Sequence, residues 1–216
     1  MLASALSPEH LISTFGLIGL FVIIFAESGL LIGFFLPGDS LLFVAGAVAA
    51  GVIEDLDVTF NIWVLLIGVF LAAVAGDQVG YLFGRKVGPS LFRRPDSKLF
   101  RQEYVDKAQE FFERNGPRAI VMARFVPIVR TFCPIVAGIG RMPYATFVRY
   151  NVVGGLLWGV GVTLLGYFFG QIDVVKNNIE VAIIGVIAIS LIPMVIELVR
   201  HRRAKAAALG AQDEPV

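Results

Sequence analysis

The most constraining feature of this sequence is an apolar segment, residues 123–138, that contains two arginines and two prolines. Each of Arg124 and Arg130 would cost about 2.5–3.5 kcal/mol at the centre of a bilayer. Pro127 and Pro134 each remove a backbone donor and disfavour helix at the preceding residue. A lipid-exposed backbone does not tolerate such a break, whereas a segment that lines a protein-walled cavity does. We therefore expect a broken, re-entrant element that holds positive charge inside the membrane.

The composition agrees with this class of protein. Of the 216 residues, 57% are hydrophobic, and the formal net charge is only +1. A soluble domain of this length is less apolar, so an all-α, polytopic membrane protein without a nucleic-acid partner is indicated. Residues 1–200 are expected to form a single membrane domain with its core at 15–170. Residues 201–216 are expected to be a basic, then polar, disordered tail.

Four apolar segments are long enough to cross the hydrocarbon core of a bilayer. They are residues 15–32, 62–84, 144–170 and 181–199. The first has no basic region before it and no small-x-small cleavage site after it, so we expect a retained span rather than a signal peptide. The fold class predicted is therefore about four transmembrane helices plus the broken segment.

A second broken segment follows the first span. Residues 33–50 are apolar but are interrupted by Pro37-Gly38-Asp39. We expect a second re-entrant hairpin there, facing the first one. Two short spans joined by a tight turn at Pro37-Gly38 are the alternative.

Charges are concentrated in the centre of the chain and set the expected topology. Residues 85–118 contain nine basic and five acidic side chains. Within them, apolar residues recur every three to four positions over 98–114, which predicts an amphipathic helix on the cytoplasmic membrane surface. Because Lys and Arg favour the cytoplasmic side, this centre and the basic tail are expected inside, with both termini cytoplasmic. The hairpin at Pro37 would then enter from outside, and that at Pro127 from the cytoplasm.

A weak internal repeat accompanies the two broken segments. Gly80-Tyr81-Leu82-Phe83-Gly84 recurs as Gly166-Tyr167-Phe168-Phe169-Gly170. Upstream of each copy lies an Ala-Gly pair, 45–46 and 137–138, in a segment interrupted by proline. The expected topology orients the two copies oppositely, and inverted repeats with broken segments are typical of secondary transporters. Chance similarity between Gly-rich apolar segments is the alternative.

Few ionisable residues fall inside the apolar segments. They are Glu27, Asp39, Asp77, Arg124 and Arg130. Such residues are functional by default in a membrane, although ion pairs that only hold a bundle together are the alternative. Asp77 could pair with Arg85 or cap a broken helix. Arg141 and Arg149, nearer the interfaces, are expected to extend to the membrane surface.

These residue types suggest an anion site with its own counter-charges. Arginine stays charged and binds phosphate through a bidentate fork, and a backbone break offers free N–H groups. Carboxylates take up a proton when burial disfavours their charged form. Arg124 and Arg130 would bind the phosphate, and Glu27 and Asp39 would neutralise the empty site and couple anion binding to protonation.

Three motifs resemble the bacterial DedA family, which shares the SNARE-associated or VTT domain. They are Phe25-Ala26-Glu27 with Pro37-Gly38-Asp39, Gly76-Asp77-x-x-Gly80-Tyr81-x-x-Gly84-Arg85, and Arg124-Phe125-x-Pro127-x-x-Arg130-Thr131 with Ala137-Gly138, Met142, Phe147, Asn151-x-x-Gly154 and Trp158. The resemblance covers residues 15–170. It implies an inner-membrane protein with two facing re-entrant hairpins that recycles undecaprenyl phosphate, in some members with the proton gradient. The family's essential acids match Glu27 and Asp39, and its essential arginines match Arg124 and Arg130. Asp77, Arg85 and Asn151 are expected to support them.

Other functions compete with a lipid-phosphate flippase. A broad phospholipid scramblase uses the same headgroup chemistry, as distant relatives of the family do. A proton-coupled small-ion transporter would explain the acids, but arginines in its path oppose a cation. A scaffold would need no charged site. An enzyme is not expected, because no Ser-His-Asp set or core histidine is present.

No cofactor or metal is expected either. His10 and His201 have no partner at ligand spacing, and Cys133 is interpreted as a small apolar wall residue. The expected partners are a polyprenyl phosphate or phospholipid and the bilayer. Gly155 and Gly159, four residues apart, could serve a homo-oligomer or only internal helix packing.

Overall fold

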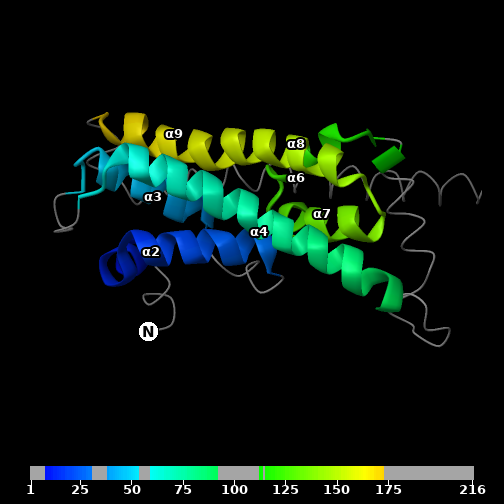
Figure 1. Ribbon diagram of the computed structural model, residues 1–216. Coiled ribbons are helices and arrows are strands. Elements are labelled where there is room, and N and C mark those ends of the chain that lie inside the picture. Colours follow the sequence, from blue (N-terminus) through cyan, green and yellow to red (C-terminus); the bar gives the residue numbers. More distant parts are fainter. Residues whose placement is uncertain (1–7, 31–37, 54–58, 92–111, 114, 173–216) are drawn as a thin grey trace, which may run out of the picture.

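The computed structural model describes residues 8–30, 38–53, 59–91, 112–113 and 115–172. The elements formed by these residues are all helices (Figure 1). In chain order they are α2 (Pro8–Gly29), α3 (Gly38–Ala49), α4 (Ile62–Leu91), α6 (Arg118–Ala123), α7 (Pro127–Ile139), α8 (Tyr144–Gly155), the π-helix η2 (Leu156–Val160) and α9 (Gly161–Gly170).

Three helices are long and apolar enough to cross a membrane. They are Leu11–Gly29 in α2, Ile62–Gly88 in α4, and Tyr144–Gly170, which α8, η2 and α9 form without interruption. The first three predicted spans are therefore confirmed as long apolar helices. The span predicted at 181–199 and the tail lie outside the described residues, as does most of the amphipathic helix predicted at 98–114.

Large apolar side chains cover the outer surface of these helices. Ile18 is 78% exposed, Trp63 70% and Phe168 61%. Water would disfavour such a surface, whereas lipid tails solvate it. Together with the three long apolar helices, this surface identifies a multi-pass membrane protein.

Two apolar helices are too short to cross a membrane. α3 has 12 residues and α7 has 13, so each is about 18–20 Å long against about 30 Å of hydrocarbon core. Ten of the 12 residues of α3 are buried, so this helix lies inside the protein rather than against lipid. This length disfavours the alternative of two short spans around Pro37-Gly38.

The break predicted in residues 123–138 occurs at one proline only. α6 ends at Ala123, Val126 is extended (φ −118°, ψ 107°), and α7 begins at Pro127. Pro134, by contrast, lies inside α7, so the expectation that it interrupts the helix is wrong. The close packing of α7 on α4 stabilises the helical conformation there, as neighbouring helices commonly do around prolines in membrane proteins.

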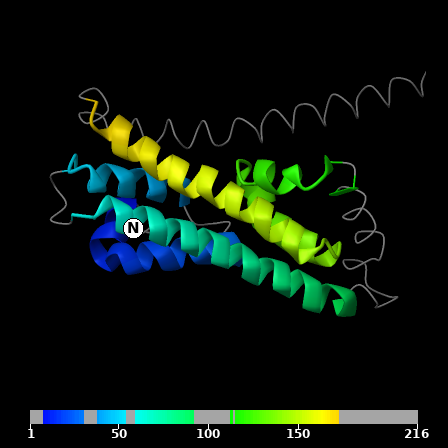
Figure 2. The same ribbon diagram turned by 45° about the horizontal axis from the view of Figure 1, so that its top comes forward.

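Each short helix packs on a long helix from the other half of the chain. α7 lies along α4, and α3 lies along α9, at opposite ends of the bundle (Figures 1 and 2). Glycines allow both contacts: Gly84 and Gly138 between α4 and α7, and Gly46 and Gly166 between α3 and α9. A Cβ atom at any of the four would overlap the backbone of the opposite helix. The two copies of the repeat therefore make corresponding contacts.

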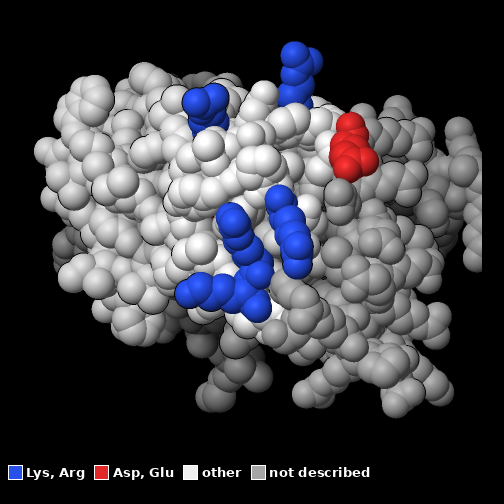
Figure 3. Space-filling view, turned by 45° about the vertical axis from the view of Figure 1, so that its right-hand side comes forward, with Lys and Arg blue, Asp and Glu red and all other residues white. Residues whose placement is uncertain are grey.

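The exposed basic side chains gather at one end of the helices. Figure 3 shows Lys and Arg around the end where α4 finishes and α8 begins, with one acidic side chain nearby. The basic residues are Arg85, Lys86, Arg118, Arg141 and Arg149, all exposed. Among the described residues at the other end, 50–53, 59–63 and 170–172, there is no Lys or Arg.

The apolar core is divided into two clusters. One contains buried side chains of α2, α3 and the first half of α4, and the other surrounds Tyr81 of α4 with side chains of α6, α7 and α8. In α4, Ala73 belongs to the first cluster and Tyr81 to the second. Asp77 lies between them, so α4 places a carboxylate at the boundary of the two apolar regions.

Candidate functional site

Arg130 of α7 lies buried between two carboxylates. Its guanidinium pairs with Glu27, near the end of α2, and its Nη1 donates to Asp39 Oδ1, in the first turn of α3, at 2.8 Å. Arg130 is 4% exposed and Glu27 2%, but the side chain of Asp39 is 15% exposed. Two consecutive helices, α2 and α3, thus meet the distant α7 at one arginine, and Asp39 is the most exposed of these three side chains.

Trp158, in the middle of η2, completes this group. Its Nε1 donates a hydrogen bond to Asp39 Oδ1 at 2.7 Å, and the Arg130 Cζ atom lies 4.3 Å from its ring centroid. A guanidinium at this distance from an indole is attracted by the ring quadrupole. We call Glu27, Asp39, Arg130 and Trp158 the Arg130 cluster.

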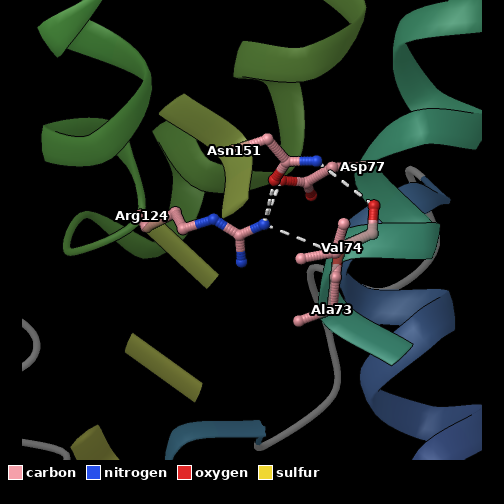
Figure 4. Close-up of polar contacts among 5 residues, drawn as sticks. All are labelled: Ala73, Val74, Asp77, Arg124 and Asn151. Atoms are coloured by element: carbon pink, nitrogen blue, oxygen red, sulfur yellow. Dashed lines mark hydrogen bonds and ion pairs between the residues drawn. The ribbon is translucent and has the colours of Figure 1, made fainter. Parts of the chain in front are cut away.

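Arg124, the residue that follows α6, forms a second group. Its Nη2 pairs with Asp77 of α4 and donates to Asn151 Oδ1 of α8, while Asn151 Nδ2 donates to the Val74 carbonyl at 3.2 Å (Figure 4). Nη2 is also 3.5 Å from the Ala73 carbonyl oxygen. Arg124, Asp77 and Asn151 are all at most 2% exposed. We call these three residues the Arg124 cluster; Trp158 adjoins both clusters, since Arg124 Cζ is 6.0 Å from its ring.

Both arginines keep donors that no acceptor satisfies within the described part of the chain. These are Nε and Nη1 of Arg124 and Nε of Arg130. Asp77 Oδ1 is likewise buried without a donor there. Unsatisfied buried charge is costly, so these atoms are the part of the two clusters that an added anion or proton would stabilise.

Two glycines provide the space for these charged side chains. A Cβ on Gly38 would overlap the Glu27 carboxylate, and one on Gly154 would come within 2.8 Å of Arg124 Cδ. The glycine of the Pro-Gly-Asp motif therefore allows α3 to approach Glu27. Gly154 likewise allows α8 to approach the Arg124 side chain.

Most of the residues proposed from the sequence meet here, and one does not. Glu27, Asp39, Asp77, Arg124, Arg130 and Asn151 belong to the two clusters. Asp77 pairs with Arg124 rather than with Arg85, which is exposed and donates to the Tyr81 hydroxyl at 3.1 Å. Arg85 therefore lies outside both clusters, and exposed Arg141 and Arg149 lie at the basic end.

Sequence reasoning assigned no role in the site to Trp158, although this residue contacts both arginines. A lone tryptophan in an apolar span is most often part of the core or of an interfacial belt, and no local pattern separates those cases from a polar contact. Cys133 is buried, in agreement with its interpretation as a wall residue. Among the described residues, no group of His, Cys, Asp and Glu is arranged to hold a metal ion.

Comparison with known proteins identifies the family of this chain. The model of the VTT domain matches residues 36–168, which include every member of the two clusters except Glu27. Protein DedA of Escherichia coli K12 is 50% identical over 189 residues, covering 88% of this chain and 84% of DedA. The chain is a DedA family membrane protein.

Further relatives also match most of the chain. An uncharacterized membrane protein of Mycobacterium tuberculosis H37Rv, Rv0364, is 42% identical over 198 residues, covering 92% of this chain and 85% of its own. Inner membrane protein YghB of Escherichia coli K12 is 35% identical over 175 residues, covering 81% and 77%. No solved structure matches the chain. The DedA family is not known for enzymes.

Proposed function

We propose that this DedA family protein is a flippase that moves a lipid phosphate, undecaprenyl phosphate above all, across the bacterial inner membrane. The observation that carries the proposal is Arg130, a buried guanidinium among apolar helices whose counter-charges, Glu27 and Asp39, come from two other helices. The planar fork of arginine binds phosphate in a bidentate manner, as it binds carboxylate, so a phosphate can compete with Glu27 and Asp39 for Arg130. An anionic headgroup therefore has a reason to enter this site.

In the proposed mechanism, the phosphate of the lipid replaces the carboxylates of Glu27 and Asp39 as the anion bound to Arg130. In the empty site the acids neutralise Arg130. An entering phosphate takes the guanidinium, also using the free Nε donor, and leaves Glu27 and Asp39 without their cation. A buried carboxylate that loses its partner is stabilised by taking up a proton. Phosphate binding and proton uptake are therefore coupled, and an inward proton gradient can drive the cycle.

The Arg124 cluster has a more static part in this mechanism. Arg124 is enclosed by Asp77 and Asn151, but two of its nitrogens have no acceptor among the described residues. It contributes positive charge near Arg130, since both guanidinium groups face Trp158. We assign it a second contact with the phosphate once the lipid has entered.

The proposal includes a membrane topology. α3 and α7 are the inner limbs of two re-entrant hairpins that bring Asp39 and Arg130 together inside the bilayer. The basic end of the helices is cytoplasmic by the positive-inside rule. If residues 181–199 form the fourth span that the sequence predicts, both termini are cytoplasmic. The related YghB is an inner membrane protein, which supports the same location for this chain.

Two other functions use the same residues. Scrambling of ordinary phospholipids needs only the phosphate chemistry of Arg130 and no proton. Proton-coupled transport of a small ion would use the Glu27 and Asp39 pair, but Arg130 between them disfavours a cation. Substrate range and dependence on a pH gradient separate these functions from the flippase.

The test is leaflet exchange of labelled undecaprenyl phosphate in proteoliposomes, with and without a pH gradient. We expect gradient-sensitive exchange by the wild type and at least tenfold slower exchange by Arg130→Lys, which keeps the charge and removes the fork. Arg149→Ala, at the exposed basic end, is the matched control and should exchange normally. Equal exchange of ordinary phospholipids without a gradient would favour the scramblase. No exchange by folded wild type would refute both lipid functions.

A further inference from the structure

We infer that Trp158 is the positioning residue that makes the Arg130–Asp39 ion pair exchangeable, by holding Asp39 when a phosphate takes Arg130. This inference rests on the proposed function and adds a residue to its site. It starts from one carboxylate oxygen, Asp39 Oδ1. That oxygen accepts from Arg130 Nη1 at 2.8 Å and from Trp158 Nε1 at 2.7 Å.

The shared oxygen has an energetic consequence. Two donors that share one acceptor atom each form a weaker bond than either would alone. Removing the last partner of a buried polar group costs much more than removing one of two. With Trp158 present, Asp39 can lose Arg130 and still keep a hydrogen bond. Without the indole N–H, the same step would leave a mostly buried carboxylate unpartnered.

Trp158 also acts on the arginine. Its ring lies 4.3 Å from Arg130 Cζ, so the indole stabilises the cation whether Asp39 or another anion occupies the guanidinium edge. Trp158 is only 2% exposed, so neither contact is lost to solvent. The indole therefore holds both partners in place while the bond between them opens.

The backbone around Trp158 has an unusual helical geometry. Trp158 is the central residue of η2, a π-helical turn inserted in the long helix between α8 and α9. π-Turns are rare and are found frequently at functional sites. This turn changes the helical register between Asn151 and Thr163, both fully buried. Asn151 contacts Arg124, Trp158 contacts Asp39, and the Thr163 carbonyl lies against Gly46 of α3.

The chain offers a direct optical test, because it contains only two tryptophans. Trp63 is 70% exposed on α4, so Trp63→Phe leaves Trp158 as the single tryptophan, which can be excited selectively over tyrosine. Titrating this variant in detergent with farnesyl phosphate should change the Trp158 emission in a saturable manner. Farnesol, which has no phosphate, should not. Inorganic phosphate distinguishes headgroup recognition from recognition of the whole lipid.

A second variant tests the hydrogen bond itself. Trp158→Phe keeps a ring against Arg130 but removes the N–H that holds Asp39. By isothermal titration, its Kd for farnesyl phosphate should rise about tenfold, as expected for losing one hydrogen bond to a charged group. Trp63→Phe is the matched control and should bind like the wild type. The thermal transition of each variant in detergent verifies that it is folded.

The outcomes separate this inference from the proposed function. If the wild type and Trp158→Phe bind farnesyl phosphate equally and the Trp158 emission does not respond, the inference is refuted while the lipid-phosphate function stands. If the wild type does not bind farnesyl phosphate, both fail. If Trp158→Phe does not fold, a saturable emission change in Trp63→Phe supports the inference, and an invariant emission overturns it.

Discussion

At the scale of single residues, the two arginines of the site differ in what surrounds them. Arg124 is enclosed by Asp77, Asn151 and the backbone of α4. Arg130 is held by two acids, one of which is partly exposed. Breaking a buried ion pair by removing one partner costs about 3–5 kcal/mol. We therefore expect the Arg124 cluster to contribute more to the stability of the fold. We expect the Arg130 cluster to contribute more to the exchange of the ligand.

Gly154 provides a sharp test at this scale. A Cβ here would lie 2.8 Å from Arg124 Cδ, so Gly154→Ala should displace the guanidinium from Asp77 and Asn151. We expect slower lipid-phosphate exchange, by about tenfold, and a lower apparent Tm in detergent, despite the higher helix propensity of alanine.

The matched control for this substitution is Gly161→Ala. A Cβ at Gly161 would meet nothing within 4 Å, so alanine there should leave exchange unchanged and raise helix stability by up to about 1 kcal/mol. Equal behaviour of the two variants would contradict the role assigned to Gly154.

At the scale of elements, the fold depends on close contact between short and long helices. The short helices α3 and α7 are held by glycine contacts to α9 and α4. Close backbone approach favours van der Waals packing, which is a main source of helix association in lipid. These contacts position Asp39 at the start of α3 and Arg130 within α7.

Gly166→Ala tests the contact between α3 and α9. The added Cβ would fall on the Phe43 backbone, which cannot move aside as a flexible side chain can. The helices must separate, so we expect a loss of about 1–3 kcal/mol of stability, typical of overpacking. Thermal unfolding in detergent measures it, again against Gly161→Ala in the same helix. A Tm at or above that of the control would show that the α3–α9 contact is looser than described.

At the scale of the whole molecule, the charge distribution predicts the orientation in the membrane. Because of the five exposed basic residues at one end of the helices, we expect that end to lie in the cytoplasm. The other end, near Thr59, then faces the outside. From its N-terminus, α4 would then run from the outside to the cytoplasm, and the α8–η2–α9 helix would run from the cytoplasm to the outside.

Cysteine labelling checks this orientation, because Cys133 is the only cysteine and is buried. In a Cys133→Ser background, Thr59→Cys and Arg149→Cys place single thiols at exposed positions at the two ends. A membrane-impermeant maleimide added to spheroplasts should label Thr59→Cys, and Arg149→Cys should react only after lysis. The reverse pattern would invert the proposed topology. The parent protein with Cys133 alone should remain unlabelled.

Several properties of this protein were determined by the sequence alone. Hydropathy and helical length are local, so the three described spans and the break before Pro127 were predictable from short windows of residues. The cost of charge in an apolar segment indicated Glu27, Asp39, Asp77, Arg124 and Arg130 as candidate site residues before any fold was known.

The pairing of these residues was decided only by the tertiary structure. Asp77 pairs with Arg124, 47 positions away, and Glu27 with Arg130, 103 positions away. Trp158 reaches Asp39 across 119 positions. Pro134 remains helical because α7 packs on α4. Helix packing determines each of these contacts. The local sequence around each partner does not determine them, because hydrogen bonds and ion pairs depend on distances that only the assembled bundle sets.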